Sequence, residues 1–198
     1  MTAPLWLLVA AAAVAAIVAA LWFTKANGPT RVADPTTLIG GPFSLVDQTG
    51  KRVTEADFRG RYTLVFFGYT FCPDVCPVEL QSMSAALDML DQKTAAEVTP
   101  VFITIDPARD TVAVMAAYVK AFHPRLIGLT GTAEEIAAAA RAYRIYYQKA
   151  AMEAADDDSY LMDHSAIVYL MGPDGKYVTH FSPGTKPEAM AARLKDLL

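Results

Sequence analysis

The length and charge of the chain limit what the protein can be. With 198 residues, the chain can form one domain with a buried core and one further segment. Its net charge of −4 gives no reason to expect nucleic-acid binding, and two cysteines are too few for a disulfide-stapled scaffold.

The first segment of the chain is strongly apolar. Residues 4–23 contain no charged side chain, and a run of about 20 apolar residues can cross a bilayer as a helix. Two tryptophans and a phenylalanine lie near its ends, where aromatic side chains anchor at membrane interfaces. A cleaved signal peptide is the alternative, but the run has no basic start and no small residues at a cleavage site. We therefore predict a single uncleaved transmembrane helix within residues 1–24 and a polar linker over residues 25–37.

Strands and helices alternate in the rest of the chain. A short strand and a hairpin turn come first, over residues 41–51. Residues 62–68 are a continuous β-branched and aromatic run, typical of a strand buried on both faces. Thr111 and Thr132 are predicted N-caps. The remaining predicted elements are a helix over 78–90, a strand over 98–105, a helix over 112–122, a strand over 126–129, a helix over 132–143, an extended segment over 144–149, a β-hairpin over 166–181 and a helix over 186–198.

This order of elements predicts the fold class. Alternating strands and helices with a late hairpin indicate an α/β sheet with flanking helices on both faces. A cysteine pair at a strand-to-helix junction in such a pattern indicates a thioredoxin-like fold. We place this domain over residues 38–198.

The two cysteines follow the predicted buried strand. Cys72 and Cys76 are separated by three residues, and Pro77 suits the first turn of a helix. A helix N-terminus lowers thiol pKa values, and the thiolate is both the metal ligand and the nucleophile. The spacing puts the sulfurs one helical turn apart, which suits chelation of a soft ion and also permits a disulfide. A purely structural disulfide is the weaker interpretation, because so short a loop removes little chain entropy.

A third donor comes late in the chain. His164 precedes the first strand of the predicted hairpin. In a thioredoxin-like sheet this segment packs against the cysteine loop, so we expect the imidazole near both sulfurs. Two thiolates and one imidazole are the donor set of trigonal copper sites. Asp163 is a candidate carboxylate for orienting a ligand.

A charged turn follows the strand predicted over residues 98–105. Asp106 and Arg109 lie at its carboxyl end, the edge of an α/β sheet where binding sites form. We expect a charge-assisted hydrogen bond between them that supports the cysteine loop. A plain helix-capping turn is the alternative.

Three segments resemble the signatures of the Sco/SenC/PrrC family. They are GYTFCPDVCP at 68–77, IDPARDT at 105–111 and YLMDHS at 160–165, in this order. The resemblance covers the chain from about residue 38 onward and implies a thioredoxin-like fold on one membrane anchor, facing the periplasm or the intermembrane space. It also implies that Cys72, Cys76 and His164 bind copper, as Cu(I) or Cu(II), for assembly of the CuA centre of cytochrome c oxidase. Ala108 departs from the family, which commonly has Glu there.

Two functions stay open at this point. The first is a membrane-anchored copper chaperone, a binding protein rather than an enzyme. Its partners would be the CuA-bearing oxidase subunit and another periplasmic copper chaperone or a thioredoxin-like reductant. The second is a thiol–disulfide reductase acting on the cysteines of that subunit. Such reductases normally have a proline before the strand that faces their cysteines; residues 163–165 contain none, which favours metal binding. A thiol peroxidase is disfavoured, because the residues that flank the cysteines offer no clear match to its Thr or Ser and Arg set.

Overall fold

The computed structural model describes residues 16–19, 22, 39–150 and 160–198. The chain divides into two units, residues 1–34 and 35–198. Of the predicted anchor, only residues 16–19 and 22 are described, and they are helical; the rest of the anchor and the predicted linker lie outside the described residues. Within the part of the chain that is described, no helix has both the length and the apolar character needed to cross a membrane.

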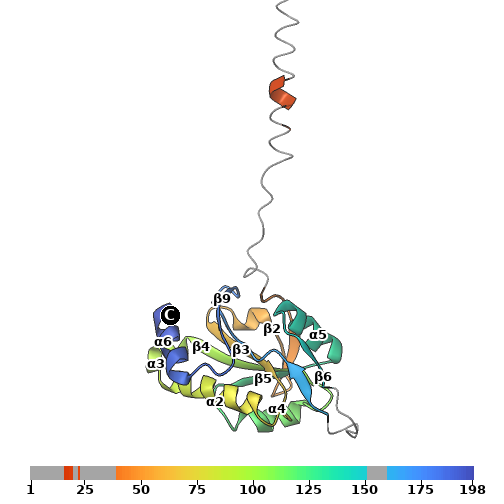
Figure 1. The fold of residues 1–198 in the computed structure, drawn as a ribbon, viewed down its shortest axis with the longest axis vertical. Coiled ribbons are helices and arrows are strands. Elements are labelled where there is room, and N and C mark those ends of the chain that lie inside the picture. Colours follow the sequence, from red (N-terminus) through yellow and green to blue (C-terminus); the bar gives the residue numbers. More distant parts are fainter. Residues whose placement is uncertain (1–15, 20–21, 23–38, 151–159) are drawn as a thin grey trace, which may run out of the picture. The chain divides into compact units, whose positions relative to one another are not determined.

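The larger unit is built around a seven-stranded mixed sheet with the order β2-β1-β5-β4-β3-β8-β9 (Figure 1). Strand β3 is parallel to β4 and antiparallel to β8, and β4 is parallel to β5. Two further strands, β6 and β7, form a separate antiparallel pair. The strands are β1 (Ser44–Asp47), β2 (Arg52–Thr54), β3 (Tyr62–Gly68), β4 (Val98–Thr104), β5 (Ile127–Thr130), β6 (Tyr147–Lys149), β7 (Met162–His164), β8 (Val168–Met171) and β9 (Tyr177–Phe181).

Helices flank this sheet, which is the predicted α/β thioredoxin-like architecture (Figure 1). They are η2, a 3-10 helix (Glu55–Phe58), α2 (Val75–Asp88), α3 (Gln92–Ala96), α4 (Val112–Val119), α5 (Ala133–Ala142) and α6 (Pro187–Leu197). Both predicted N-caps are present: the hydroxyl of Thr111 accepts from the N–H of Val114, and Thr132 forms a capping box with Glu135. These hydrogen bonds satisfy backbone donors that the first helical turn leaves free.

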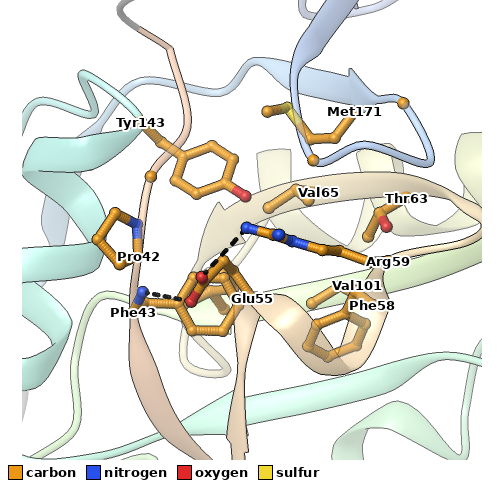
Figure 2. A pocket seen from close by; sticks show the side chains of 14 residues that line it. Pro42, Phe43, Glu55, Phe58, Arg59, Thr63, Val65, Val101, Tyr143 and Met171 are labelled. Atoms are coloured by element: carbon orange, nitrogen blue, oxygen red, sulfur yellow. Dashed lines mark hydrogen bonds and ion pairs between the residues drawn. The ribbon is translucent and has the colours of Figure 1, made fainter.

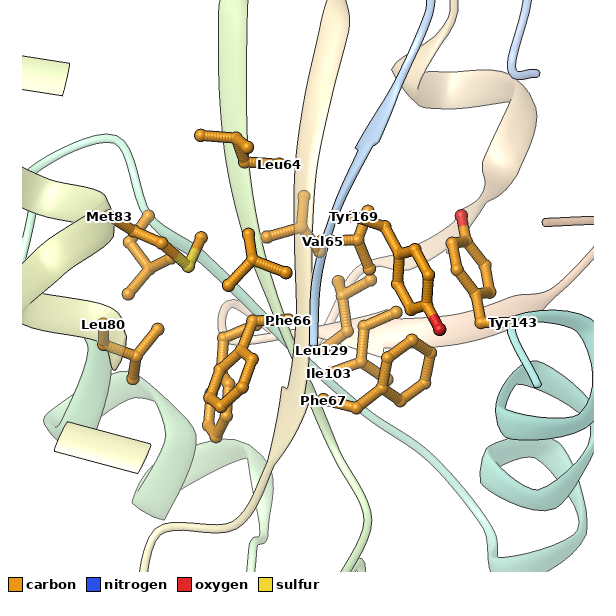
Figure 3. Close-up of a cluster of buried hydrophobic side chains, with 14 of the residues drawn as sticks. Leu64, Val65, Phe66, Phe67, Leu80, Met83, Ile103, Leu129, Tyr143 and Tyr169 are labelled. Atoms are coloured by element: carbon orange, nitrogen blue, oxygen red, sulfur yellow. The ribbon is translucent and has the colours of Figure 1, made fainter. Parts of the chain in front are cut away.

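Strand β3 is buried on both faces, as its sequence predicts (Figure 3). Phe66 points toward α2, where Leu80 and Met83 pack. Phe67 points to the other face, where its ring centroid lies 5.3 Å from that of Tyr143. The strand therefore forms the centre of the core, and its carboxyl end carries the cysteine loop.

The structure differs from the predicted elements at the start of α2 and in four short elements, of which η2 and β7 are two. Helix α2 begins at Val75, three residues earlier than predicted. Val75 and Val78 are both exposed, so the apolar spacing does not mark where the helix begins. Helix α3 and strand β2 were not predicted: both are short, and α3 depends on the capping carboxylate of Asp91 rather than on an apolar face. The predicted extended segment 144–149 contains β6, which pairs with β7.

Candidate metal centre

Three donor atoms meet at the carboxyl end of β3. The sulfurs of Cys72 and Cys76 and a ring nitrogen of His164 all lie within 4.8 Å of one another. Among the described residues, this is the only group of three or more Cys, His, Asp or Glu side chains placed closely enough to hold a metal ion. The structure thus brings the three predicted ligands together.

The cysteine loop is shaped by the start of α2. Cys72 lies in the turn after β3, where its N–H donates to the carbonyl of Tyr69 at 3.3 Å. Cys76 lies in the first turn of α2, and its backbone N–H donates to the sulfur of Cys72 at 3.4 Å. Both are free thiols; the side chain of Cys76 is buried and that of Cys72 is half-buried. The N-terminus of α2 therefore stabilises negative charge on the Cys72 sulfur.

The orientation of His164 suits metal binding. Its Nδ1 lies 3.2 Å from the carbonyl oxygen of Ser165, and because a carbonyl can only accept, Nδ1 carries the proton. In the neutral ring Nε2 then holds the free lone pair, and it lies 3.4 Å from the sulfur of Cys76. The rings of Phe66 and Tyr69 contact the imidazole edge-on at centroid distances of 6.2 and 5.9 Å. The imidazole is thus held in the tautomer that a metal requires.

The pKa values of the two cysteines shift in opposite directions. A hydrogen bond from the Cys76 thiol lowers the pKa of Cys72 to about 3 despite its partial burial. The same hydrogen bond and burial raise the pKa of Cys76 far above its ordinary value. At neutral pH the pair is therefore a Cys72 thiolate beside a Cys76 thiol. A metal ion bound by both sulfurs displaces the proton of Cys76.

Asp106 and Arg109 form hydrogen bonds with each other and with a third residue, Tyr160. Arg109 donates through Nε to the Asp106 carboxylate, which is the bond that the sequence predicts. Tyr160 donates its hydroxyl to the other Asp106 oxygen at 2.7 Å, and Arg109 donates through Nη1 to the Tyr160 carbonyl at 2.9 Å. The guanidinium also lies 3.7 Å from the Tyr160 ring centroid. We call Asp106, Arg109 and Tyr160 the clasp, because they join the loop after β4 to the segment that leads into His164.

Two further residues hold the cysteine loop, and sequence reasoning gave neither a role. The wholly buried carboxylate of Asp110 accepts from the backbone N–H of Thr70 at 3.0 Å and from the Thr104 hydroxyl at 2.6 Å. The hydroxyl of Tyr69 accepts from the N–H of Met162 at 3.2 Å, which connects the loop to β7. Both residues lie inside the quoted sequence segments, but Tyr69 bonds to Met162 across 93 residues and Asp110 bonds to Thr70 across 40 residues, so local spacing does not indicate these contacts.

The structure does not bring Asp163 to the site. Its side chain is exposed, and alternation along β7 directs it to the face opposite His164. The carbonyl of Ser165, not the carboxylate of Asp163, accepts from the imidazole. The predicted role of Asp163 in orienting the ligand therefore has no contact to support it among the described residues.

Comparison with known proteins agrees with this geometry. The SCO1/SenC family model matches residues 31–198. The chain is 51% identical over 143 residues to "Protein SCO1 homolog 1, mitochondrial" of Arabidopsis thaliana, covering 72% of this chain and 42% of that protein. It is 47% identical over 158 residues to "Protein SCO1 homolog, mitochondrial" of Homo sapiens, covering 79% of this chain and 52% of that one.

A solved structure extends the comparison to the fold. The structure of Bradyrhizobium japonicum ScoI with copper bound superposes with a TM-score of 0.73 at 47% identity, covering 81% of this chain and 99% of that chain. The chain spans only about half the length of the two mitochondrial relatives, 42% and 52%. The family match and these identities establish that the chain belongs to the SCO1/SenC family.

Proposed function

We propose that the protein is a copper chaperone that supports assembly of the CuA centre of cytochrome c oxidase. The observation that carries this proposal is the meeting of Cys72, Cys76 and His164 within 4.8 Å, with Nε2 facing the sulfurs. Copper is the cargo of this site. The related Bradyrhizobium japonicum ScoI has been solved with copper bound, which supports the same cargo here.

The donor set suits both oxidation states of copper. Cu(I) is soft and accepts coordination by two thiolates, whereas Cu(II) prefers an additional nitrogen donor. We therefore expect Cys72 and Cys76 to hold Cu(I) without a strict need for His164, and all three residues to hold Cu(II). Asp106 and Arg109 would support the site through the clasp.

The surroundings of the site fit transfer to another protein. The side chains of Phe71, Val75 and Val78 are 53%, 41% and 47% exposed, and they flank the two cysteines along the chain. Exposed apolar side chains beside a functional site are typical of a surface that docks a partner. The proposed acceptor is the CuA-bearing oxidase subunit, and another copper chaperone or a thioredoxin-like reductant would act before it.

The proposed location follows from the first segment. Residues 1–24 would form a single membrane anchor and residues 25–37 a linker, with the domain over residues 38–198 facing the periplasm or the intermembrane space. The names of the Arabidopsis thaliana and Homo sapiens relatives described above contain the word mitochondrial. Sequencing the N-terminus of the protein in the membrane fraction tests the anchor, and a start beyond about residue 24 would refute it.

Thiol–disulfide exchange with the oxidase subunit is the second candidate function. The different pKa values of the two cysteines favour it. The half-buried Cys72 thiolate can attack a disulfide of the subunit and form a mixed disulfide, and Cys76 can then displace the subunit's thiol and form the Cys72–Cys76 disulfide. This chemistry needs both cysteines but no imidazole. His164 therefore separates the two functions.

Copper titration tests the metal site directly. The full chain titrated with Cu(II) should develop a thiolate-to-copper charge-transfer band at one equivalent, and His164→Ala should lose it while retaining Cu(I). The matched control is His180→Ala, which removes an exposed imidazole on β9 outside the donor group and should keep the band. An unchanged band in His164→Ala would refute the third ligand.

Complementation then separates chaperone from reductase. In a strain that lacks the gene, CuA oxidase activity should be restored by the wild-type chain but by neither His164→Ala nor Cys72→Ser. Full rescue by His164→Ala together with failure of Cys72→Ser would assign the function to dithiol chemistry instead.

A further inference from the structure

A cavity of about 120 Å³ lies on one face of the sheet (Figure 2). Apolar side chains of β3 and β4, namely Val65, Val101 and Ile103, form one wall. Further apolar lining comes from Phe43, Phe58 and Met171. None of the three candidate metal ligands lines this cavity, so it is a separate feature of the fold.

One buried polar group faces this apolar space. Tyr143 is 5% exposed, and its hydroxyl points into the cavity (Figure 2). Within the described residues, this hydroxyl has no hydrogen-bond partner. Burial raises the pKa of Tyr143, so the hydroxyl stays neutral and is able to donate as well as accept. Because the hydroxyl faces the cavity, a ligand in that space can form a hydrogen bond with it.

An ion pair lies beside the hydroxyl. Glu55 Oε1 and Arg59 Nη2 are 3.7 Å apart, and the second oxygen of Glu55 accepts from the N–H of Phe43 at 3.3 Å (Figure 2). The two charges cancel, so the cavity as a whole favours neither an anion nor a cation. A neutral ligand with a hydrogen-bonding group is repelled neither by the Glu55 carboxylate nor by the Arg59 guanidinium.

The size of the cavity limits the ligand to a single ring. An engineered apolar cavity of about 150 Å³ in another protein binds benzene. We propose that this cavity is a binding site for a small neutral phenol, with the ring against the apolar wall and the hydroxyl bonded to that of Tyr143. This site is independent of copper binding and goes beyond the proposed chaperone function.

Phenol and toluene are the probes that test this site. The two rings are almost equal in size, but only phenol can bond to the Tyr143 hydroxyl. In the full chain with 13C-labelled methionine methyl groups, phenol should shift the Met171 resonance with a dissociation constant of about 1 mM, typical for so small a ligand. Toluene should bind more weakly, by roughly 2- to 10-fold, the value of one hydrogen bond.

Tyr143→Phe removes only the hydroxyl and keeps the ring. It should lower the affinity for phenol to that for toluene and leave the affinity for toluene unchanged. Tyr146→Phe removes an exposed hydroxyl outside the cavity and should change neither the affinity for phenol nor the affinity for toluene. Cys72→Ser should bind phenol like the wild type, so that a failure of the copper proposal is distinguishable from a failure of this one.

Two results would overturn the proposal. One is an unshifted Met171 resonance at about 10 mM phenol, ten times the expected constant, which would mean that the cavity holds water only. The other is a preference for phenol over toluene that survives in Tyr143→Phe. Loss of that preference in Tyr143→Phe alone would support it.

Discussion

Gly68 and the sulfur of Cys76 are in such close contact that no larger residue fits at position 68. A Cβ built on Gly68 would lie 2.6 Å from Cys76 Sγ and 3.0 Å from Cε2 of Phe102. Gly68 is the last residue of β3, and Cys76 is fully buried against it in the first turn of α2. The absent side chain is therefore what lets α2 bring its cysteine down onto the sheet.

Gly68→Ala should damage the metal site more than the fold. The added methyl group displaces the Cys76 sulfur, so we expect Cu(II) affinity to fall at least tenfold, while overpacking lowers the free energy of unfolding by about 1–3 kcal/mol. Copper titration and urea unfolding measure the two effects.

Gly128→Ala in β5 is the matched control for this change. Its Cβ would meet Val119 Cγ1 at 2.7 Å, a similar overpacking away from the cysteines. It should lose comparable stability and keep the Cu(II) spectrum. Wild-type copper binding by Gly68→Ala would show that the contact with Cys76 does not shape the site.

The two cysteines should react at very different rates in the reduced, metal-free chain. Cys72 is a half-buried thiolate whose pKa is lowered to about 3, so iodoacetamide should modify it first, at a rate nearly constant from about pH 5 upward. Cys76 is buried and its raised pKa keeps it a thiol. Peptide mass spectrometry at timed intervals distinguishes the two sites. A Cys72 rate that rises tenfold per pH unit from pH 6 to 8 would identify an ordinary thiol instead.

The sequence was sufficient to predict the parts of the fold that have a local signal. The β-branched run that forms β3 and the capping threonines Thr111 and Thr132 each depend on residues adjacent in the chain. The cysteine pair was predictable for the same reason. The place of His164 beside it came from the family resemblance and the expected sheet, not from spacing.

The contacts that support the site have no such signal. Tyr160 bonds to Asp106 across 54 residues, and Thr70 bonds to Asp110 across 40 residues. A tyrosine or an aspartate in the sequence carries no mark of which distant group it will meet, because tertiary packing decides that. Asp163 shows the converse: its position next to the ligand suggested a role, but alternation along β7 directs its side chain away.

Tyr160→Phe should loosen His164 through the clasp. The change removes the hydrogen bond from Tyr160 to Asp106, on the segment that leads directly into β7. Groups that orient metal ligands typically contribute 10- to 100-fold in affinity, and Tyr160 acts less directly, so we expect Cu(II) affinity to fall by about 10-fold. Cu(I) affinity should stay within about twofold, because two thiolates suffice for it.

Tyr177→Phe is the control for a lost tyrosine hydrogen bond. The hydroxyl of Tyr177 lies 2.6 Å from Nδ1 of His180, on β9 and outside the donor group. The variant should lower the free energy of unfolding by up to about 1.5 kcal/mol without changing the affinity for Cu(I) or for Cu(II). A parallel loss of Cu(I) and Cu(II) affinity in Tyr160→Phe would mean that the clasp supports the fold generally rather than the imidazole.

Glu79 should make the protein less stable as the pH rises. This residue is buried on α2; one carboxylate oxygen accepts from the N–H of Gly184 at 2.6 Å, and the other has no hydrogen-bond partner among the described residues. Burial raises the pKa of Glu79 above its ordinary value of 4.5, so the folded state holds this proton more tightly than the unfolded chain. The resulting stability is fully present below about pH 4.5 and is lost as the pH rises through the folded-state pKa.

Glu79→Gln should remove this pH dependence. The amide keeps an oxygen for the Gly184 N–H and stays neutral at every pH, so the variant should gain stability relative to the wild type between pH 4.5 and 7. Urea unfolding across that range measures the difference. Glu188→Gln, which changes an exposed glutamate on α6, should follow the wild-type curve. If the gap between wild type and Glu79→Gln stayed constant or narrowed with rising pH, the buried carboxylate would not be the source of the effect.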